Sequence, residues 1–191
     1  MPATARRDRE RAQRHQMIIT AARELAEAEG WDAVTTRRLA ERIEYSQPGL
    51  YSHFDGKDAI VRAVAIQGFE ELAEHLRRAR TGAEGSGQGL QSLCRAYLDF
   101  AATQPALYQA MFVMPTDVKF ASEDTPAPLR AGFDEFVSAL PPGTQERELT
   151  AEVTWSALHG MAVLAATRRI PPDGQGERVN LLAARIITAP A

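Results

Sequence analysis

The sequence predicts an all-α fold, in which a small N-terminal head of three helices precedes a larger helical body. Apolar residues recur every three or four positions along most of the 191 residues, which is the spacing of amphipathic helices. About nine such segments follow one another, most of them separated by glycine or proline, and no segment alternates convincingly as a strand does. Hydrophobic residues make up 45% of the chain, which is enough for a core.

The head begins with a helix whose apolar residues end before Gly30. Thr35 caps a second helix that reaches about Ile43, and Ser46 caps a third that reaches about Phe54. The apolar residues of the first helix are Ile18, Ala21, Ala22, Leu25 and Ala28.

The body supplies the remaining six predicted helices. They cover about residues 57–80, 90–101, 105–114, 129–140, 145–168 and 177–188. The helix over 57–80 has two apolar stripes, which is typical of a helix that joins two packed bodies. We therefore expect two domains: residues 1–57, with a basic arm and the head, and residues 58–191, which form the body.

Charge is distributed unevenly along the chain. The net charge is −3, but residues 1–57 hold ten basic and nine acidic residues, and the stretch from Arg6 to Arg14 alone holds five arginines. This pattern indicates a cationic arm attached to an acidic body. The alternative is a solvated, disordered tail.

The three short helices of residues 14–54, with a tight turn between the last two, have the pattern of a helix-turn-helix. In such a unit one helix enters the major groove of DNA. The third helix suits this role because it is short and carries no acid. Gln47 can hydrogen-bond base edges, and Gly49 permits close approach at a helix-propensity cost of roughly 1 kcal/mol.

Residues 35–42, 46–54 and 56–58 together resemble the DNA-binding signature of the TetR family of bacterial transcription regulators. The resemblance implies DNA-backbone contacts by Thr36, Arg37, Tyr51, His53 and Lys57. It places Gln47, Pro48, Gly49 and Ser52 in the major groove. Taken singly, these residues have simpler interpretations, such as a boundary aromatic or a surface histidine, and the order and spacing of the whole set favour DNA.

The sequence departs from the family pattern at the turn. Ile43 and Glu44 stand in place of the usual small residue and glycine, and Tyr45 stands in place of the usual valine. Glu44 brings a negative charge near the expected phosphates. Gly49 occupies a position that often carries a base-contacting side chain.

A second resemblance lies in the body. Residues 155–160 and 105–112 are similar to the WHG-type C-terminal domain of a TetR subgroup, which implies a small-molecule pocket. The expected lining residues are Phe69, Tyr97, Tyr108, Met111, Phe112, Phe136, Trp155 and His159. Trp155 and His159 are four apart and share a helix face. The alternative is a core tryptophan and a histidine that caps a backbone carbonyl.

A single head contacts few base pairs, so we expect a homodimer. The last two long helices are the expected pairing surface, and two of them from each chain would form a four-helix bundle. The residues expected there are Leu158, Met161, Ala162, Ala165, Leu181, Leu182 and Ile186. The alternative places these residues in an intramolecular core.

Several classes of function are not expected. Cys94 is the only cysteine, so an intramolecular disulfide and metal sites with several thiolates are excluded. We expect no catalytic residues, no metal site and no cofactor. The longest apolar run is too short to span a membrane, and no apolar run follows the arginine-rich start, so we expect a cytoplasmic protein.

These features together predict a ligand-responsive transcriptional regulator. It would bind double-stranded operator DNA, most simply as a repressor that a small molecule releases. Two alternatives stay open at this point. One is an enzyme in the helical body with His159 as general base, and the other is a protein-interaction module whose head no longer binds DNA.

Overall fold

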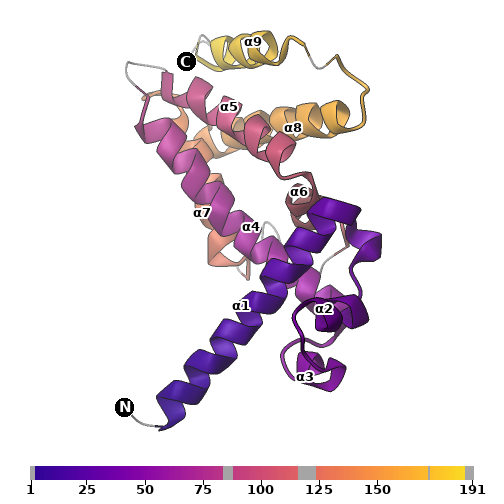
Figure 1. The fold of residues 1–191 in the computed structure, drawn as a ribbon. Coiled ribbons are helices and arrows are strands. Elements are labelled where there is room, and N and C mark those ends of the chain that lie inside the picture. The colour runs from indigo at the N-terminus through magenta and orange to yellow at the C-terminus, as the bar shows by residue number, and fades with distance from the viewer. Residues whose placement is uncertain (1–2, 84–87, 116–123, 172, 188–191) are drawn as a thin grey trace. The chain divides into compact units, whose positions relative to one another are not determined.

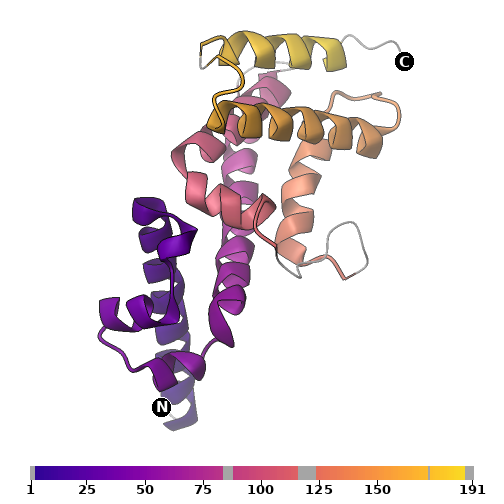
Figure 2. The same ribbon diagram turned by 90° about the vertical axis from the view of Figure 1, so that its right-hand side faces the viewer.

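The computed structural model describes residues 3–83, 88–115, 124–171 and 173–187, and this part of the chain is helical without a strand, which confirms the all-α prediction (Figures 1 and 2). The helices are α1 (Ala3–Glu29), α2 (Thr36–Arg42), α3 (Gln47–Tyr51), α4 (Gly56–Thr81), α5 (Gln88–Thr103), α6 (Pro105–Phe112), α7 (Ala127–Ala139), α8 (Arg147–Ala166) and α9 (Gln175–Ile187), with a 3-10 turn, η1, at Trp31–Ala33. Among the described helices, none has the length and apolar character that a membrane crossing requires.

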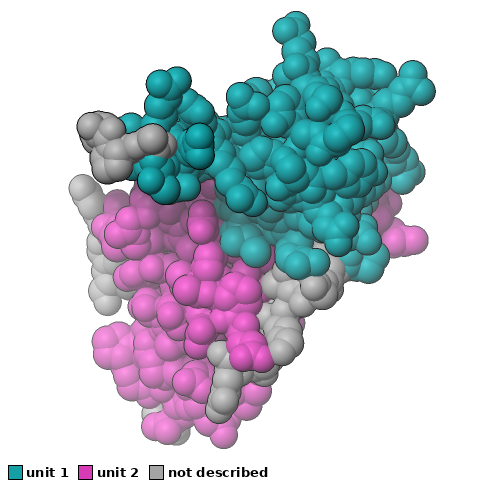
Figure 3. Space-filling view, turned by 90° about the horizontal axis from the view of Figure 1, so that it is seen from below, with its two compact units in different colours: residues 1–68, 106–118 teal, residues 69–105, 119–191 magenta. Residues whose placement is uncertain are grey.

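The chain divides into two compact units (Figure 3). The first combines Met1–Gly68 with Ala106–Val118, and the second combines Phe69–Pro105 with Lys119–Ala191. The helix α4 therefore runs from one unit into the other, and all but the first residue of α6 belongs to the same unit as the head. The functional boundary expected after residue 57 stays a prediction.

Side-chain caps form the head helices where the sequence predicts them. Thr35 accepts a hydrogen bond from the backbone N–H of Arg38, and Ser46 accepts one from that of Gly49. The third helix ends at Tyr51, earlier than expected, because the chain turns there toward Gly56, whose φ is 82°. The 3-10 turn η1 between α1 and α2 was not expected from the periodicity.

The cationic arm is part of α1. The helix begins at Ala3, so the structure shows a helical extension in place of a disordered tail, and Figure 1 shows this half of α1 running past α2 and α3. The segment has no apolar stripe to reveal it in the sequence. An ion pair one turn apart, between Arg6 Nε and Glu10 Oε1 at 2.8 Å, supports it locally.

The helix α6 is held to α1 and η1 by polar contacts at its first turn. The indole of Trp31 donates to the carbonyl of Ala106 over 2.8 Å. The carboxylate of Glu27 accepts from the backbone N–H groups of Ala106, at 3.2 Å, and Leu107, at 3.0 Å. These bonds satisfy donors that a helix start leaves without partners, so Glu27 caps α6 from a distant part of the sequence.

Glycine lets α4 and α6 approach closely. A Cβ added at Gly68 would lie 2.6 Å from Met111 Sδ and 2.8 Å from Leu107 Cδ1. Any larger residue at this position therefore forces the neighbouring side chains to move.

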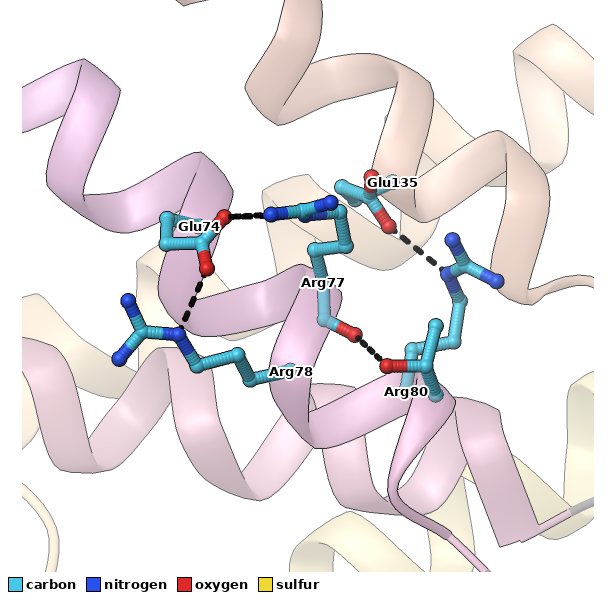
Figure 4. A network of polar contacts seen from close by, with 6 residues as sticks. Glu74, Arg77, Arg78, Arg80 and Glu135 are labelled. Atoms are coloured by element: carbon cyan, nitrogen blue, oxygen red, sulfur yellow. Dashed lines mark hydrogen bonds and ion pairs between the residues drawn. The ribbon is translucent and has the colours of Figure 1, made fainter.

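In the second unit α5 packs against α7, α8 and α9. The ion pair between Arg80 and Glu135 joins α4 to α7 in this unit (Figure 4). Arg80 Nε lies 2.8 Å from Glu135 Oε2, and Glu74 pairs with both Arg77 and Arg78 along α4.

Two residues predicted at the pairing surface lie in the core instead. Leu158 has no exposed surface within the single chain, and Ala162 is 8% exposed. Both therefore follow the alternative, an intramolecular core, because a side chain already packed inside its own chain has no surface left to offer a partner.

Candidate nucleic-acid interface

The recognition candidate α3 is anchored by its apolar residue and exposes its polar ones. Leu50 is fully buried, whereas Gln47, Pro48 and Ser52 are exposed and Tyr51 is 54% exposed. The Ser52 hydroxyl donates to the carbonyl of Gly49 over 2.6 Å and so reinforces the last turn. The buried Leu50 thus packs α3 against the rest of the head, and the opposite face of α3 is exposed to solvent.

The residues expected to contact phosphates on either side of α3 fall into neighbouring positions. Thr36 Oγ1 and Tyr51 Oη are 3.4 Å apart, so the start of α2 and the end of α3 meet there. Arg37 is exposed and pairs with Glu41 through Nε and Oε1 at 2.9 Å. Such an exposed ion pair is weak, so the guanidinium can exchange its partner at little cost.

Lys57 lies at the first turn of α4 and is half-buried. Its Nζ donates to the carbonyl of Trp31 over 2.5 Å, which ties α4 to η1. An ammonium group has three donors, so two remain for a phosphate oxygen at this helix start.

The turn between α2 and α3 keeps a glycine-like backbone without glycine. Glu44 has a φ of 52°, in the left-handed region that favours glycine. The backbone N–H of the next residue, Tyr45, donates to Ala40 over 2.9 Å and closes the turn. The departure at Glu44 therefore leaves the geometry of the motif intact and adds backbone strain.

The departures at positions 45 and 49 are one packing arrangement. A Cβ at Gly49 would lie 2.5 Å from Tyr45 Cε1 and 2.8 Å from Cζ, so the tyrosine ring occupies the space that a side chain at 49 needs. Arg14 lies over the same ring, 5.2 Å from its centroid, and donates to Tyr45 Oη over 3.1 Å. Sequence reasoning noted each departure but missed that they belong together.

His53 faces α1 and the turn. It is half-buried, and in the described part of the chain its buried Nδ1 has no hydrogen-bond partner. The ring centroids of His15 and Tyr45 lie 6.5 and 6.3 Å from that of His53. Burial, and then the charges of Arg11, His15 and Arg14, lower the pKa of His53, which favours its neutral form.

Four of the expected pocket residues meet in the second unit. Trp155 Nε1 donates to Tyr97 Oη over 3.0 Å, and the rings of Tyr97 and Phe136 meet edge to face with centroids 5.7 Å apart. The centroids of Trp155 and His159 are 6.5 Å apart. Burial lowers the pKa of His159.

The other expected pocket residues are divided between the units. Phe69 is buried in the second unit, while Tyr108, Met111 and Phe112 belong to α6 in the first. The rings of Tyr108 and Phe112 lie 4.7 Å apart. The pocket itself stays a prediction.

Large apolar side chains are exposed on the last two helices. Leu149, Val153 and Leu164 of α8 are 52%, 59% and 40% exposed, and Leu181 and Ile187 of α9 are 61% and 42% exposed. Sequence reasoning missed the three residues of α8, although Leu149 and Val153 are about one helical turn apart and Leu164 follows about three turns later, so all three lie near one face of the helix.

The predicted pairing residues that are not core remain at least partly accessible. This group comprises Met161, Ala165, Leu181, Leu182 and Ile186. An apolar surface of this kind on a helix pair is typical of an interaction face.

Comparison with known families gives two matches that together cover most of the chain. The family described as "Bacterial regulatory proteins, tetR family" matches residues 18–64, which contain α2 and α3. The family described as "Tetracyclin repressor-like, C-terminal domain" matches residues 90–189, about half of the chain.

Individual relatives agree with these matches. The chain is 34% identical over 101 residues to YobS, an HTH-type transcriptional regulator of Bacillus subtilis, a match that covers 53% of this chain and 52% of that protein. It is 28% identical over 155 residues to the HTH-type transcriptional regulator Rv0681 of Mycobacterium tuberculosis, covering 78% and 69%. The matched region thus spans about half the length of the first of these curated relatives.

A solved structure shares the fold. The crystal structure of a TetR/AcrR-family transcriptional regulator from Thermobifida fusca superposes with a TM-score of 0.66 and 16% identity. The superposition covers 94% of this chain and 99% of the other.

Proposed function

Because the chain belongs to the TetR family of bacterial regulatory proteins, we propose that it is a DNA-binding transcriptional regulator whose α3 enters the major groove. The observation that carries the proposal is the outward face of α3, where Gln47, Pro48, Tyr51 and Ser52 are exposed over a buried Leu50. Gln47 reads a base edge, and adenine is its best partner because the amide donates and accepts at once.

The contacts around α3 fix its register on the duplex. Thr36, Arg37, Tyr51, His53 and Lys57 supply hydroxyl, imidazole and cationic groups suited to phosphate oxygens. Glu44 opposes them with a negative charge at the turn. Backbone contacts of this kind orient a protein without reading sequence, so specificity falls to the residues in the groove.

We propose that the regulator acts as a homodimer through α8 and α9. A stable dimer requires apolar surface that is exposed in the single chain, and Val153, Leu164 and Leu181 provide it. Two-fold symmetry then presents two heads to successive major grooves, roughly 34–36 Å apart. The expected operator is accordingly an inverted repeat.

The second unit is proposed to bind a small-molecule effector near Tyr97, Trp155 and His159. An indole, a phenol and a neutral imidazole among apolar residues match the usual composition of such sites. A ligand that binds more tightly to a conformation whose two heads do not match successive major grooves lowers the affinity for DNA. The loss equals the difference between the ligand's binding free energies for the two conformations, typically about 1–3 kcal/mol. This describes a repressor released from its operator in the cytoplasm.

The alternatives of an enzyme or a protein-interaction module with a vestigial head are not favoured, since residues 18–64, which contain α2 and α3, match the TetR family of bacterial regulatory proteins. The direct test is selection of genomic fragments by the purified protein, followed by affinity measurements on the recovered duplex. Gln47→Ala should relax preference at one base pair in each half-site, by about 1–3 kcal/mol. Recovery of unrelated fragments with no shared sequence would contradict the proposal.

A further inference from the structure

A groove runs between the N-terminal half of α1 and the end of α3. It has a volume of about 280 Å³ and is lined by Arg7, Glu10, Arg11, Arg14, Ser52 and His53. Positions 7, 11 and 14 fall on one face of an α-helix, so three of the five arginines between residues 6 and 14 line it together. Arg6 and Arg9 are not among its lining residues.

The α1 wall of the groove carries uncompensated positive charge. Glu10 is the acid among the lining residues, and it already pairs with Arg6 at 2.8 Å. Within residues 3–83, 88–115, 124–171 and 173–187, neither Arg7 nor Arg11 forms an ion pair. Arg14 donates to the neutral phenol of Tyr45.

The opposite wall comes from Ser52, the C-cap residue of α3, and from His53, which follows it. Ser52 is exposed, and His53 has a buried Nδ1 without a partner in the described structure. Burial lowers the pKa of His53, and the charges of Arg11, His15 and Arg14 lower it further, which is consistent with the arginines that line the groove. An anion bound in the groove would offset the positive charge of these arginines.

We propose that this groove binds the phosphodiester backbone of the duplex beside the major groove that α3 enters, with Arg7 and Arg11 as its cationic contacts. The inference rests on the proposed function and adds a second, sequence-independent contact to the base-reading helix. The contact is made by the face of the helical extension that carries Arg7 and Arg11, and not by Arg6 or Arg9, which do not line the groove. The Arg14–Tyr45–Gly49 packing holds the extension against the turn.

Two matched variants test the assignment. Arg11→Ala and Arg9→Ala remove the same charge from the same exposed helix, two residues apart, and only Arg11 lines the groove. Each phosphate contact contributes a slope of roughly −0.9 to the dependence of log affinity on log salt concentration. A homodimer loses two such contacts, so Arg11→Ala should flatten the slope by about 1.8. Between 50 and 200 mM salt, the affinity of this variant should therefore fall by a factor roughly ten-fold smaller than the affinity of the wild type falls.

The measurement uses the full chain and the duplex recovered by selection, with circular dichroism to confirm equal helix content in both variants. Ethylation interference should show that Arg11→Ala loses sensitivity at phosphates flanking the α3 contacts, whereas Arg9→Ala keeps the wild-type pattern. Equal slopes for both variants, flattened or not, would overturn the groove assignment. Failure of the wild-type chain to prefer any duplex would instead overturn the proposed function.

Discussion

Glu44 holds a backbone conformation that costs a side chain free energy. Its φ of 52° lies in the left-handed region, where a residue with a Cβ is strained by about 1–2 kcal/mol. Glu44→Gly should therefore raise the free energy of unfolding by about 1 kcal/mol, less than the full strain because glycine also gains freedom in the unfolded chain. Urea unfolding measures this change, provided that the dependence of the unfolding free energy on urea concentration is the same in the variant and the wild type.

Glu44→Gln is the matched control, because it removes the charge and keeps the strain. It should leave stability nearly unchanged, and both variants should bind duplex DNA more tightly than the wild type, since each removes a negative charge near phosphates. Equal stabilisation by glycine and glutamine would show that charge, not backbone strain, is the cause.

Tyr45 and Gly49 form a coupled pair. Because a Cβ at Gly49 would lie 2.5 Å from the tyrosine ring, Gly49→Ala must displace the ring from Arg14. In a Tyr45→Val background the same alanine no longer meets the ring, and the contact that remains is with Ser46 Oγ, 2.9 Å from the added Cβ. We expect Gly49→Ala to be more favourable by about 1 kcal/mol in that background, measured as the coupling energy of a double-mutant cycle. Strict additivity would contradict the packing described.

His53 makes stability depend on pH. Its pKa is lowered in the folded chain by burial and by Arg11, His15 and Arg14, so the unfolded chain binds the proton more readily. The free energy of unfolding should therefore fall as the pH drops below about 6.5, the ordinary histidine pKa. His53→Gln should flatten this dependence.

His159 serves as the comparison for that titration, because burial lowers its pKa as well and it lies in the other unit. The double variant with His159→Gln should be flatter than either single variant. An unchanged pH profile in His53→Gln would mean that the histidine is as well solvated in the folded chain as in the unfolded one.

At the scale of elements, the contact of α4 with α6 depends on a missing side chain. Gly68→Ala places a methyl group 2.6 Å from Met111 Sδ, and such overpacking typically costs about 1–3 kcal/mol against a propensity gain of about 1 kcal/mol. We expect net destabilisation in thermal and urea unfolding, relieved in part by Met111→Ala, since Leu107 Cδ1 would still lie 2.8 Å from the added methyl group. Stabilisation, the usual outcome of glycine to alanine inside a helix, would contradict the close approach.

Sequence patterns predicted the elements whose causes are local. The caps at Thr35 and Ser46 were predictable because the hydrogen bonds join residues three apart. The helical extension of α1 escaped prediction because it carries no apolar stripe. The cap of α6 by Glu27 escaped because the two partners are 80 residues apart in sequence.

The candidate site divides in the same way. The order of residues in α2 and α3 predicted an exposed reading helix, and the structure exposes Gln47 and Ser52 as expected. The groove between α1 and α3, and the packing of Tyr45 on Gly49, depend on how distant side chains meet in space. Periodicity carries no information about such contacts. It also does not distinguish an apolar face that packs inside the chain from one that pairs with a partner, and Leu158, predicted at the pairing surface, is buried within the single chain.

At the scale of the whole molecule, two copies of α3 in the proposed homodimer read one DNA sequence together. The most direct measurement compares the affinity of the full chain for the selected duplex with that for a scrambled duplex of equal length, at 0.15 M salt as roughly physiological ionic strength. The selected duplex should bind more tightly by a factor of about 10³ or more, with two chains bound per duplex. Equal affinities for the two duplexes would contradict it.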